Sequence, residues 1–570
     1  MRGTGAKGAR SARGANGVRA TRRVAIAAGI VAVGTSTALA AGTFGFGAPP
    51  AAGLLSLGGL TTTVDTSRTS LTDTNLTTRT STSTSSGLLS PSAQITVAGA
   101  ITAGWDDNAT TPPTHMSLVT EAIGADQLWA RGIDGAGIGV AVIDSGIAPV
   151  DAMATTNNNK VVNGPDLSFE SQATEYRHLD TFGHGTHMAG IVAGRDDAIG
   201  FKGVAPGAHV VNLKVANYQG AVDVSQVIAA IDWVVQHRND PGMNIRVLNL
   251  AYGTDANTSY KTDPLTHAVE SAWRKGITVV VSGGNDGTER PALNNPATDP
   301  YVIAVGAADV KGTATAADDQ VAPFSSRGNS TRYVDVVAPG VSIASLRTPG
   351  STVDDEHPTA RVGDHLVRGS GTSQAAAVTA GAAALLLQAQ PNLTPDGVKA
   401  LLRATATPLL NDGTRAQGAG RIDVAAASLG TPSLLKTQAW ALSTGLGLLE
   451  PARGTSHVAQ DGVELRGEQD IFGRSWSGAI WAPQATAGAA WDGGRWNGTE
   501  WTGTCWCGSS WTASTWEGKS WTGKSWTGKS WTADDWSGKS WTGKSWTGTS
   551  WTGKSWTGKS WTGKSWTTPA

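Results

Sequence analysis

The sequence contains very little cysteine: Cys505 and Cys507 are the only two in 570 residues, and they lie two positions apart near the C-terminus. A disulfide framework therefore cannot hold the main body together, and that body must depend on a hydrophobic core. An excess of one charge is also lacking, because 44 Lys and Arg residues balance 45 Asp and Glu residues. Whole-chain electrostatics thus give no reason to expect a nucleic-acid partner. The sequence does not decide whether the cysteines stay reduced or pair between chains.

The N-terminal apolar run is too short to span a bilayer. It covers residues 24–33, follows a segment rich in arginine and lysine, and precedes Ala38-Leu39-Ala40. A basic segment, an apolar run and small residues in this order are typical of a secretory signal peptide. We therefore expect a signal peptide over residues 1–40, no transmembrane anchor, and a secreted protein that is extracellular or associated with the cell wall.

Serine and threonine dominate residues 61–113, which show no sustained helical or strand periodicity. A segment of this composition buries too little apolar surface to close a core. We expect residues 41–115 to form a Ser/Thr-rich spacer, with a pro-region as the alternative.

Residues 116–430 are the main folded region that the pattern predicts. Short β-branched runs alternate there with amphipathic stretches, such as residues 227–235, whose apolar residues recur at helical spacing. This alternation favours an α/β fold with a mostly parallel sheet and helices on both faces. Ligands bind outside the carboxyl ends of the strands in such folds. The expected strands are residues 138–143, 210–215, 246–251, 277–281, 302–305 and 334–337.

Three motifs in this region carry groups suited to nucleophilic catalysis. Asp144 ends the strand GIGVAVID, His184 lies in GHGTHMAG, and Ser373 begins an Ala-rich helix in GSGTSQAAAV that Pro391 helps to end. Serine is a poor nucleophile at neutral pH, so a nearby imidazole must accept its proton and later protonate the leaving amine. A carboxylate must hold that imidazole in the correct tautomer. We therefore assign Ser373 as nucleophile, His184 as base and Asp144 as its orienting carboxylate.

The motifs DSG, HGTHMAG and GTSQA, in the order Asp, His, Ser, resemble those of the subtilisin-like serine peptidases, the subtilases. An α/β-hydrolase would instead carry a GxSxG motif before its Asp and His. The resemblance continues through GVAPGA, FSSRG and VAPG, and covers slightly more than half the chain. It implies a serine endopeptidase that cleaves polypeptide substrates through an acyl-enzyme, with no cofactor required for the chemistry. Relatives often bind calcium, but no calcium-loop pattern is recognisable here. We assign no metal ligands, and the sequence does not decide whether the protein binds structural calcium.

The same resemblance implies further site residues. Asn285, in SGGNDG, matches the family's oxyanion asparagine, and the backbone N–H of Ser373 would be a second donor. Substrate binding along strand edges would demand little of the substrate sequence, so we expect broad specificity. Asp286 either favours a basic substrate residue or is a solvated loop carboxylate. The expected substrate-binding residues are Gly220, Ala251, Tyr252, Gly253, Ser282, Gly283 and Gly284.

Some residues depart from the family pattern. Gln374, Ala376 and Ala377 replace the Met, Ser and Pro common in relatives, but no catalytic group is lost. Residues 351–368 look longer than in compact relatives, which suggests a loop near the cleft. His187 is expected to have a structural packing role.

The C-terminal region is a repeat. From Trp476 onward tryptophan recurs every fifth residue, with an early gap at Thr486. An odd period favours a turn-rich coil or a stacked solenoid over a flat strand. We expect a linker over residues 431–470 and a Trp-rich repeat region over residues 471–570.

Two functions compete for the repeat. Its tryptophans would stack on the sugar rings of a cell-wall polymer or polysaccharide while Lys519, Lys524 and Lys529 meet anionic groups. The alternative is a self-packed or low-complexity tail. For the whole protein, the rival to a peptidase is a catalytically inactive, wall-attached binding protein, which would not hydrolyse casein.

Overall fold

The computed structural model describes residues 104–105, 112–153, 160–171, 175–431, 437–455, 457–460, 463–492 and 494–501, and the backbone of five strands between residues 522 and 567. The expected signal peptide, most of the Ser/Thr-rich segment and both cysteines lie outside the described residues. The assignments made for them stay predictions. Within the described part, no helix has both the length and the apolar composition needed to cross a bilayer.

The body contains a central sheet of eight strands, which lie between residues 139 and 339. Its order is β11-β10-β9-β8-β3-β7-β4, with β12 also paired to β10, and every pairing is parallel except that of β10 with β11. Six strands match the expected ranges to within two residues at each end, except that β10 ends four residues later than expected. The strands are β3 (Gly139–Asp144), β4 (Val161–Asp166), β7 (His209–Lys214), β8 (Ile245–Leu250), β9 (Thr278–Ser282), β10 (Ile303–Asp309), β11 (Gln320–Val321) and β12 (Val336–Pro339).

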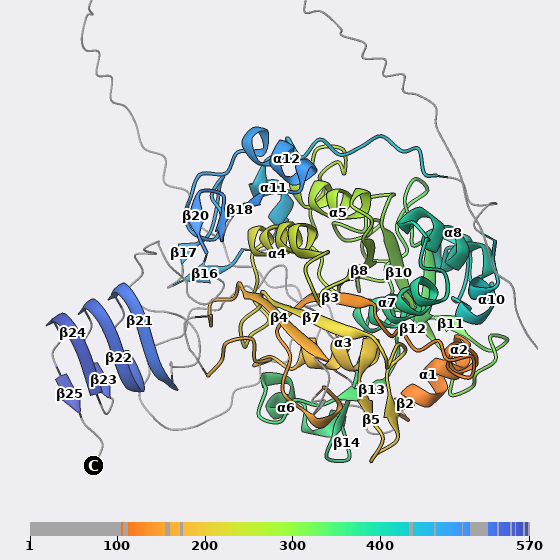
Figure 1. Ribbon diagram of the computed structural model, residues 1–570, viewed down its shortest axis with the longest axis horizontal. Coiled ribbons are helices and arrows are strands. Elements are labelled where there is room, and N and C mark those ends of the chain that lie inside the picture. Colours follow the sequence, from red (N-terminus) through yellow and green to blue (C-terminus); the bar gives the residue numbers. More distant parts are fainter. Residues whose placement is uncertain are drawn as a thin grey trace, which may run out of the picture. The chain divides into compact units, whose positions relative to one another are not determined.

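Helices pack on both faces of this sheet (Figure 1). α3 (His184–Ala193) and α7 (Thr372–Ala389) pack against each other and against the strands, while α4 (Val224–His237) and α5 (Pro264–Arg274) form the other pair. The Asp223 side chain caps α4, and the Gln226 side chain accepts from the Asp223 backbone N–H at 2.7 Å, which closes a capping box. The predicted α/β class with a mostly parallel sheet is confirmed.

A second sheet lies at one side of the body and has the order β1-β15-β13-β2, with β14 paired to β15. Its strands are β1 (Gly104–Trp105), β2 (Thr114–His115), β13 (Ile343–Leu346), β14 (Arg361–Val362) and β15 (Leu366–Ser370). The remaining elements up to residue 428 are α1 (Met116–Ala122), α2 (Ala125–Trp129), η1 (Asp151–Met153), β5 (Arg195–Asp196), β6 (Phe201–Lys202), α6 (Thr352–Glu356), η2 (Pro358–Ala360), α8 (Pro395–Thr405), α9 (Thr414–Gln417) and α10 (Val424–Ser428).

The described residues of the expected linker pack against α4 and α5. In α11 (Leu449–Arg453) the Arg453 guanidinium is buried and its Nε lies 2.7 Å from Oδ2 of Asp223. The backbone N–H of Ser443 donates to Glu270 on α5 at 2.7 Å. These contacts extend the body beyond residue 430, while the exact domain boundaries stay a prediction. The other elements here are β16 (Ala459–Gln460), β17 (Val463–Glu464), α12 (Gly478–Ala487), β18 (Trp491–Asp492), β19 (Arg495–Trp496) and β20 (Thr499–Glu500).

The first tryptophans of the repeat are buried in this extension. The indole N–H groups of Trp481 and Trp496 both donate to Oδ2 of Asp232 on α4, at 2.7 and 2.8 Å. The ring of Trp476 lies 5.0 Å from that of Trp481 and 5.8 Å from that of Trp496. Rings packed in this way have no face left for stacking on a sugar. The buried members are Trp476, Trp481, Trp491, Trp496 and Trp501.

The docking of these tryptophans predicts a pH-dependent stability. Burial raises the pKa of Asp232 from its ordinary 3.8 to about 7. Between about pH 4 and pH 7, Asp232 is therefore protonated in the folded protein and ionised in the unfolded chain. Unfolding releases a proton in this range, so the free energy of unfolding falls as the pH rises. We expect Asp232→Asn, which stays neutral, to gain stability over the wild type by up to about 1.4 kcal/mol per pH unit across this range. Thermal unfolding against pH measures this, with the exposed Asp240→Asn as control; parallel wild-type and Asp232→Asn curves would contradict it.

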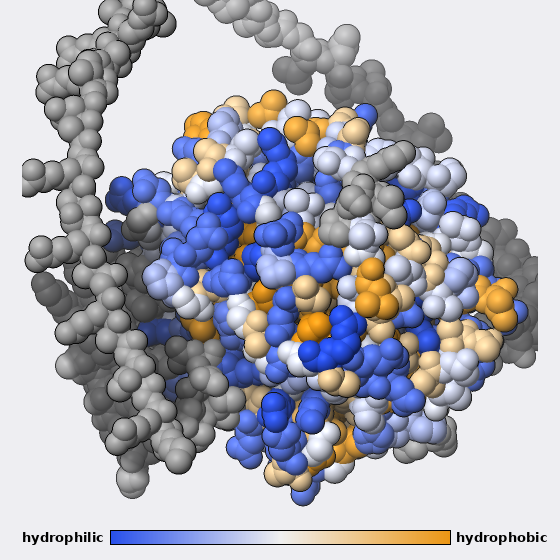
Figure 2. Space-filling model, turned by 45° about the vertical axis from the view of Figure 1, so that its right-hand side comes forward, coloured by the Kyte–Doolittle hydropathy of each residue, from blue (hydrophilic) through white to orange (hydrophobic). Residues whose placement is uncertain are grey.

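Later repeats form a parallel sheet of their own. Trp526 pairs with Trp541 and Trp541 with Trp556, so that each layer lies fifteen residues from the next. Its strands are β21 (Thr522–Thr532), β22 (Asp535–Thr547), β23 (Ser550–Thr552), β24 (Ser555–Thr562) and β25 (Ser565–Thr567). On the face of the body in Figure 2, hydrophobic side chains lie in small groups among hydrophilic ones.

Candidate active site

Asp144 and His184 meet at the carboxyl edge of the central sheet. Asp144 is the last residue of β3 and His184 the first of α3, and both side chains are buried. Nδ1 of the imidazole lies 2.8 Å from Oδ1 and 2.9 Å from Oδ2 of the carboxylate. A carboxylate only accepts, so Nδ1 carries the proton and Nε2 of the neutral ring is left with its lone pair. This is the tautomer that a general base needs.

A network of buried groups holds the Asp144 carboxylate. The backbone N–H of Ser145 donates to Oδ1 at 2.7 Å, and the Ser145 hydroxyl lies 2.8 Å from Oδ1 of Asp180. Asp180 also accepts from the backbone N–H groups of Gly183 and Thr186 at 2.7 and 2.8 Å. Burial raises the pKa of Asp180. The network ties the end of β3 to the start of α3.

Gly185 permits this close approach. A Cβ atom at residue 185 would lie 2.1 Å from the carbonyl oxygen of Gly146 and 3.2 Å from Oδ1 of Asp144. Its backbone N–H donates to the Ser145 hydroxyl at 2.9 Å. The small residue after His184 is therefore required by contact with the loop after Asp144.

Ser373 is the second residue of α7, which packs against both α3 and the central strands. Its side chain is buried, at 2% exposure. Nε2 of His184 is also buried and has no hydrogen-bond partner within the described part of the chain, so no bond from the Ser373 hydroxyl to it is formed. Such bonds are often long in free enzymes and tighten when substrate binds.

Asn285 is oriented by the residue that precedes Ser373. Its Oδ1 accepts from the backbone N–H of Thr372 at 2.9 Å and lies 3.0 Å from the Thr372 hydroxyl. Because a backbone N–H must donate, the oxygen end of the amide faces Thr372 and Nδ2 is the opposite end. The Thr372 hydroxyl also accepts from the backbone N–H of Gly284 at 3.2 Å. The loop after β9 is thereby fixed to the start of α7.

The expected substrate-binding residues lie at neighbouring strand ends. Ala251, Tyr252 and Gly253 follow β8, while Ser282, Gly283 and Gly284 end and follow β9, its parallel neighbour. Gly253 and Gly284 both abut Asn294, which lies within 2.9 Å of the Cβ position of each. The two segments thus border one surface. Their role in substrate binding stays a prediction.

Six of the seven expected substrate-binding residues are buried, and Gly253 is half-buried. Tyr252 is 2% exposed, and burial, then the charge of Asp223, raise its pKa well above the ordinary value. Gly220 has a φ of 75° and its Cβ position lies 3.1 Å from the Phe182 ring. A side chain at residue 220 would meet that ring.

His187 lies one helical turn after His184 and is fully buried. Burial, and then the electrostatic interaction with His184, lower the pKa of His187 to about 3. His187 is therefore neutral at physiological pH, in keeping with the packing role expected of it.

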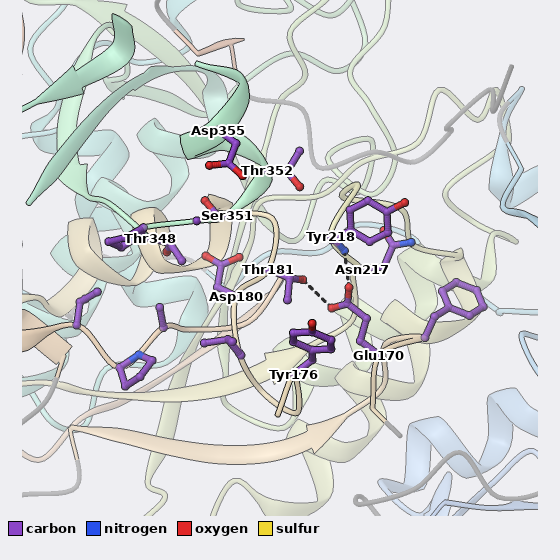
Figure 3. Close-up of a pocket in the computed structure, with 17 residues that line it drawn as sticks. Glu170, Tyr176, Asp180, Thr181, Asn217, Tyr218, Thr348, Ser351, Thr352 and Asp355 are labelled. Atoms are coloured by element: carbon purple, nitrogen blue, oxygen red, sulfur yellow. Dashed lines mark hydrogen bonds between the residues drawn. The ribbon is translucent and has the colours of Figure 1, made fainter. Parts of the chain in front are cut away.

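A cavity of about 550 Å³ lies beside the network that holds Asp144 (Figure 3). Asp180 lines it, and Glu170 on another wall accepts from the Thr181 hydroxyl at 2.6 Å and the Tyr218 backbone N–H at 2.9 Å. A further wall comes from residues 348–352 and Asp355. Part of the long loop expected near the cleft therefore lies beside the segment that leads to His184.

Among the described residues, no three His, Cys, Asp or Glu side chains gather in a way that could hold a metal ion.

Sequence reasoning missed the roles of Ser145, Asp180 and Thr372. Ser145 and Thr372 directly adjoin Asp144 and Ser373 in sequence, which is the signal that could have pointed to them. Asp180, four residues before His184, offered no such signal, because its partner Ser145 is 35 residues away.

Comparison with known proteins finds several serine proteases that are similar in sequence to this chain. The chain is 37% identical over 318 residues to serine protease AprX of Bacillus subtilis, which covers 54% of this chain and 70% of AprX. It is 35% identical over 303 residues to subtilisin DY of Bacillus licheniformis, covering 53% of this chain and 93% of the relative. A third relative, 32% identical over 271 residues, is the minor extracellular protease Epr of Bacillus subtilis, with 48% of this chain and 35% of Epr covered.

The family model of the subtilases matches residues 135–434, more than half of the chain. The matched region includes the central sheet, α3 and α7. It also contains Asp144, His184 and the groups that support them. The chain therefore belongs to the subtilase family of serine-type peptidases.

Proposed function

We propose that this peptidase cleaves internal peptide bonds through Ser373 as nucleophile, His184 as general base and acid, and Asp144 as the carboxylate that orients His184. The observation that carries the proposal is the pair of contacts, 2.8 and 2.9 Å, between Nδ1 of His184 and the Asp144 carboxylate. They leave Nε2 as the acceptor for a proton from the Ser373 hydroxyl.

In the first step, Ser373 Oγ attacks the substrate carbonyl carbon while its proton passes to Nε2 of His184. The tetrahedral oxyanion is stabilised by Nδ2 of Asn285 and the backbone N–H of Ser373. His184 then protonates the leaving amine, the C–N bond breaks and an acyl-enzyme remains. Water, deprotonated by His184, hydrolyses that ester and restores the serine. None of these steps requires a cofactor.

Broad specificity is part of the proposal. The ends of β8 and β9 offer backbone edges at residues 251–253 and 282–284, and an extended peptide would bind there by main-chain hydrogen bonds. Glycines at positions 253, 283 and 284 present few side-chain atoms to discriminate between substrates.

The test is casein hydrolysis by the full chain and its block by a serine-directed phosphonate. We expect the inhibitor to form one covalent adduct, which mass spectrometry locates on Ser373. Unchanged hydrolysis after treatment, or an adduct elsewhere, would contradict the assignment. The rival hypothesis of an inactive binding protein predicts no hydrolysis at all; the burial of the first five repeat tryptophans gives it no support from those residues.

Export is proposed from the basic leader, the apolar run of residues 24–33 and Ala38-Leu39-Ala40. We expect the protein recovered from the culture medium to lack residues 1–40. N-terminal sequencing of that material measures this, and a secreted form that still begins at Met1 would contradict it.

A further inference from the structure

A short strand from upstream of the matched family region pairs with β15, the strand that precedes the proposed nucleophile in sequence. β1 pairs antiparallel with β15, so that Gly104 lies opposite Ser370 and Trp105 opposite Gly369. β15 ends at Ser370, close in sequence to Ser373. The edge of β15 thus binds an extended chain next to the proposed site by adding a strand to the sheet.

The indole of Trp105 lies against two imidazole rings. Its centroid is 6.1 Å from that of His184 and 5.3 Å from that of His187, and both contacts are edge-to-face, at 84° and 89°. His184 is 0% exposed. Trp105 is therefore one of the groups that cover the proposed general base.

The remainder of the indole packs in a hydrophobic cluster separate from the main core. Val353, Ala360 and Val367 are its buried members, and Trp105 and Phe182 pack against them. All three buried members belong to the long loop of residues 351–368. We call the surface made by Phe182, His184, His187, Val353, Ala360 and Val367 the aromatic slot.

The floor of the aromatic slot is shaped for a flat ring. A Cβ atom at residue 369 would lie 3.0 Å from Cζ3 of Trp105, so glycine at this position leaves room for the indole. The same Cβ position lies 2.6 Å from Nε2 of Gln374, the residue after the proposed nucleophile. Both polar atoms of the Gln374 amide are buried and have no hydrogen-bond partner among the residues that the structure describes. An unpaired buried amide is costly, which points to a polar ligand that pairs with it in another state.

The loop that forms the slot is fixed in place. The Asp354 carboxylate accepts from Nη2 of Arg347 at 2.9 Å and from Nε of Arg361 at 2.7 Å. The backbone N–H of Val353 donates to the carbonyl of Phe182 at 2.9 Å, two residues before His184. The aromatic slot is therefore held in a fixed position relative to the imidazole.

We propose that the aromatic slot binds an aromatic side chain on the leaving-group side of a polypeptide substrate, and that Trp105 is the chain's own competing occupant. This inference rests on the proposed function. The leaving amine takes its proton from Nε2 of His184, so the leaving part of the substrate must lie over this imidazole, where the Trp105 ring lies. The backbone of the substrate adds to β15 as residues 104–105 do. The Gln374 amide forms hydrogen bonds with polar groups of the substrate.

The test compares Trp105→Ala with wild type on two fluorogenic peptides. They are identical up to the scissile bond and carry either Trp or Ala at the second and third positions beyond it. We expect Trp105→Ala to raise kcat/KM for the Trp peptide on the order of tenfold, because the slot becomes free for the substrate ring. Trp105→Ala also has a higher kcat/KM for the Trp peptide than for the Ala peptide. In Trp105→Phe the phenyl ring still occupies the slot, so kcat/KM for the Trp peptide stays close to the low wild-type value. Mass spectrometry verifies that residues 104–105 remain attached in each preparation.

The matched control is Trp440→Ala, which removes an exposed indole remote in sequence from the slot. Its kinetics stay at the wild-type level. A small chromogenic anilide with no residues beyond the scissile bond reports the proposed triad alone. If the anilide is cleaved and Trp105→Ala does not prefer the Trp peptide, the slot proposal is overturned and the proposed function stands. If neither the wild type nor any of the variants cleaves the anilide or either peptide, the proposed function fails. Should Trp105→Ala not fold, Trp105→Phe and the preference of the wild type between the two peptides decide the question.

Discussion

Ser373→Ala is expected to lower kcat by roughly a millionfold while the fold is retained. The size of the loss follows from the way such residues act together: without the nucleophile, the imidazole and carboxylate have no reaction to assist. A hydroxyl replaced by hydrogen at a helix start changes packing little, so binding of substrate survives. Peptide hydrolysis by the purified variant, measured against the wild type at saturating substrate, gives the value.

Three further variants test the same assignment. Ser330→Ala, the same change at an exposed loop serine, keeps wild-type activity. His184→Ala alone and the double variant His184→Ala/Ser373→Ala fall to about the level of Ser373→Ala, because the losses within one catalytic unit do not add. If Ser373→Ala kept more than a hundredth of the wild-type turnover, another residue would be the nucleophile. A double variant far below both single variants would show that the residues do not act as a unit.

The triad assignment could be made from sequence because each motif combines a reactive residue with the local structure that exposes it. Asp144 follows five buried residues of β3 directly, and the start of an Ala-rich helix at Thr372 places Ser373 in the first turn. The short β-branched strands were predictable for the same reason, since periodicity and composition agree there. β4 was missed because its sequence VVNGPD ends in Gly, Pro and Asp, residues that disfavour a central strand.

Contacts between distant segments could not be read from pattern. Asp223 and Asp232 hold the described part of the C-terminal extension on α4. Their partners Arg453, Trp481 and Trp496 lie more than 200 residues away in sequence. A five-residue tryptophan repeat gives the same local signal whether the rings are exposed or buried, because burial depends on the surface they meet. The position of Trp105 against His184 is of the same kind, and no property of the Ser/Thr-rich segment pointed to it.

Asn285→Ala is expected to lower kcat on the order of a hundredfold or more, with KM nearly unchanged. Charge develops on the substrate oxygen only in the transition state, so a lost donor to that oxygen affects turnover and not ground-state binding. Steady-state kinetics on one peptide substrate separate the two constants. Asn257→Ala, an exposed asparagine in the loop after β8, is the matched control and keeps both values.

The structure also suggests a different cause for such a loss, because Oδ1 of Asn285 accepts from the Thr372 backbone and could act by holding Ser373 in place. Asn285→Asp distinguishes the two. Aspartate keeps an oxygen acceptor for Thr372 but has no N–H to offer the oxyanion, so donation predicts a loss as large as that of Asn285→Ala. Positioning predicts instead that Asn285→Asp retains most of the activity and that Asn285→Ala raises KM and lowers the melting temperature. Near-wild-type turnover in Asn285→Asp would therefore overturn the oxyanion role.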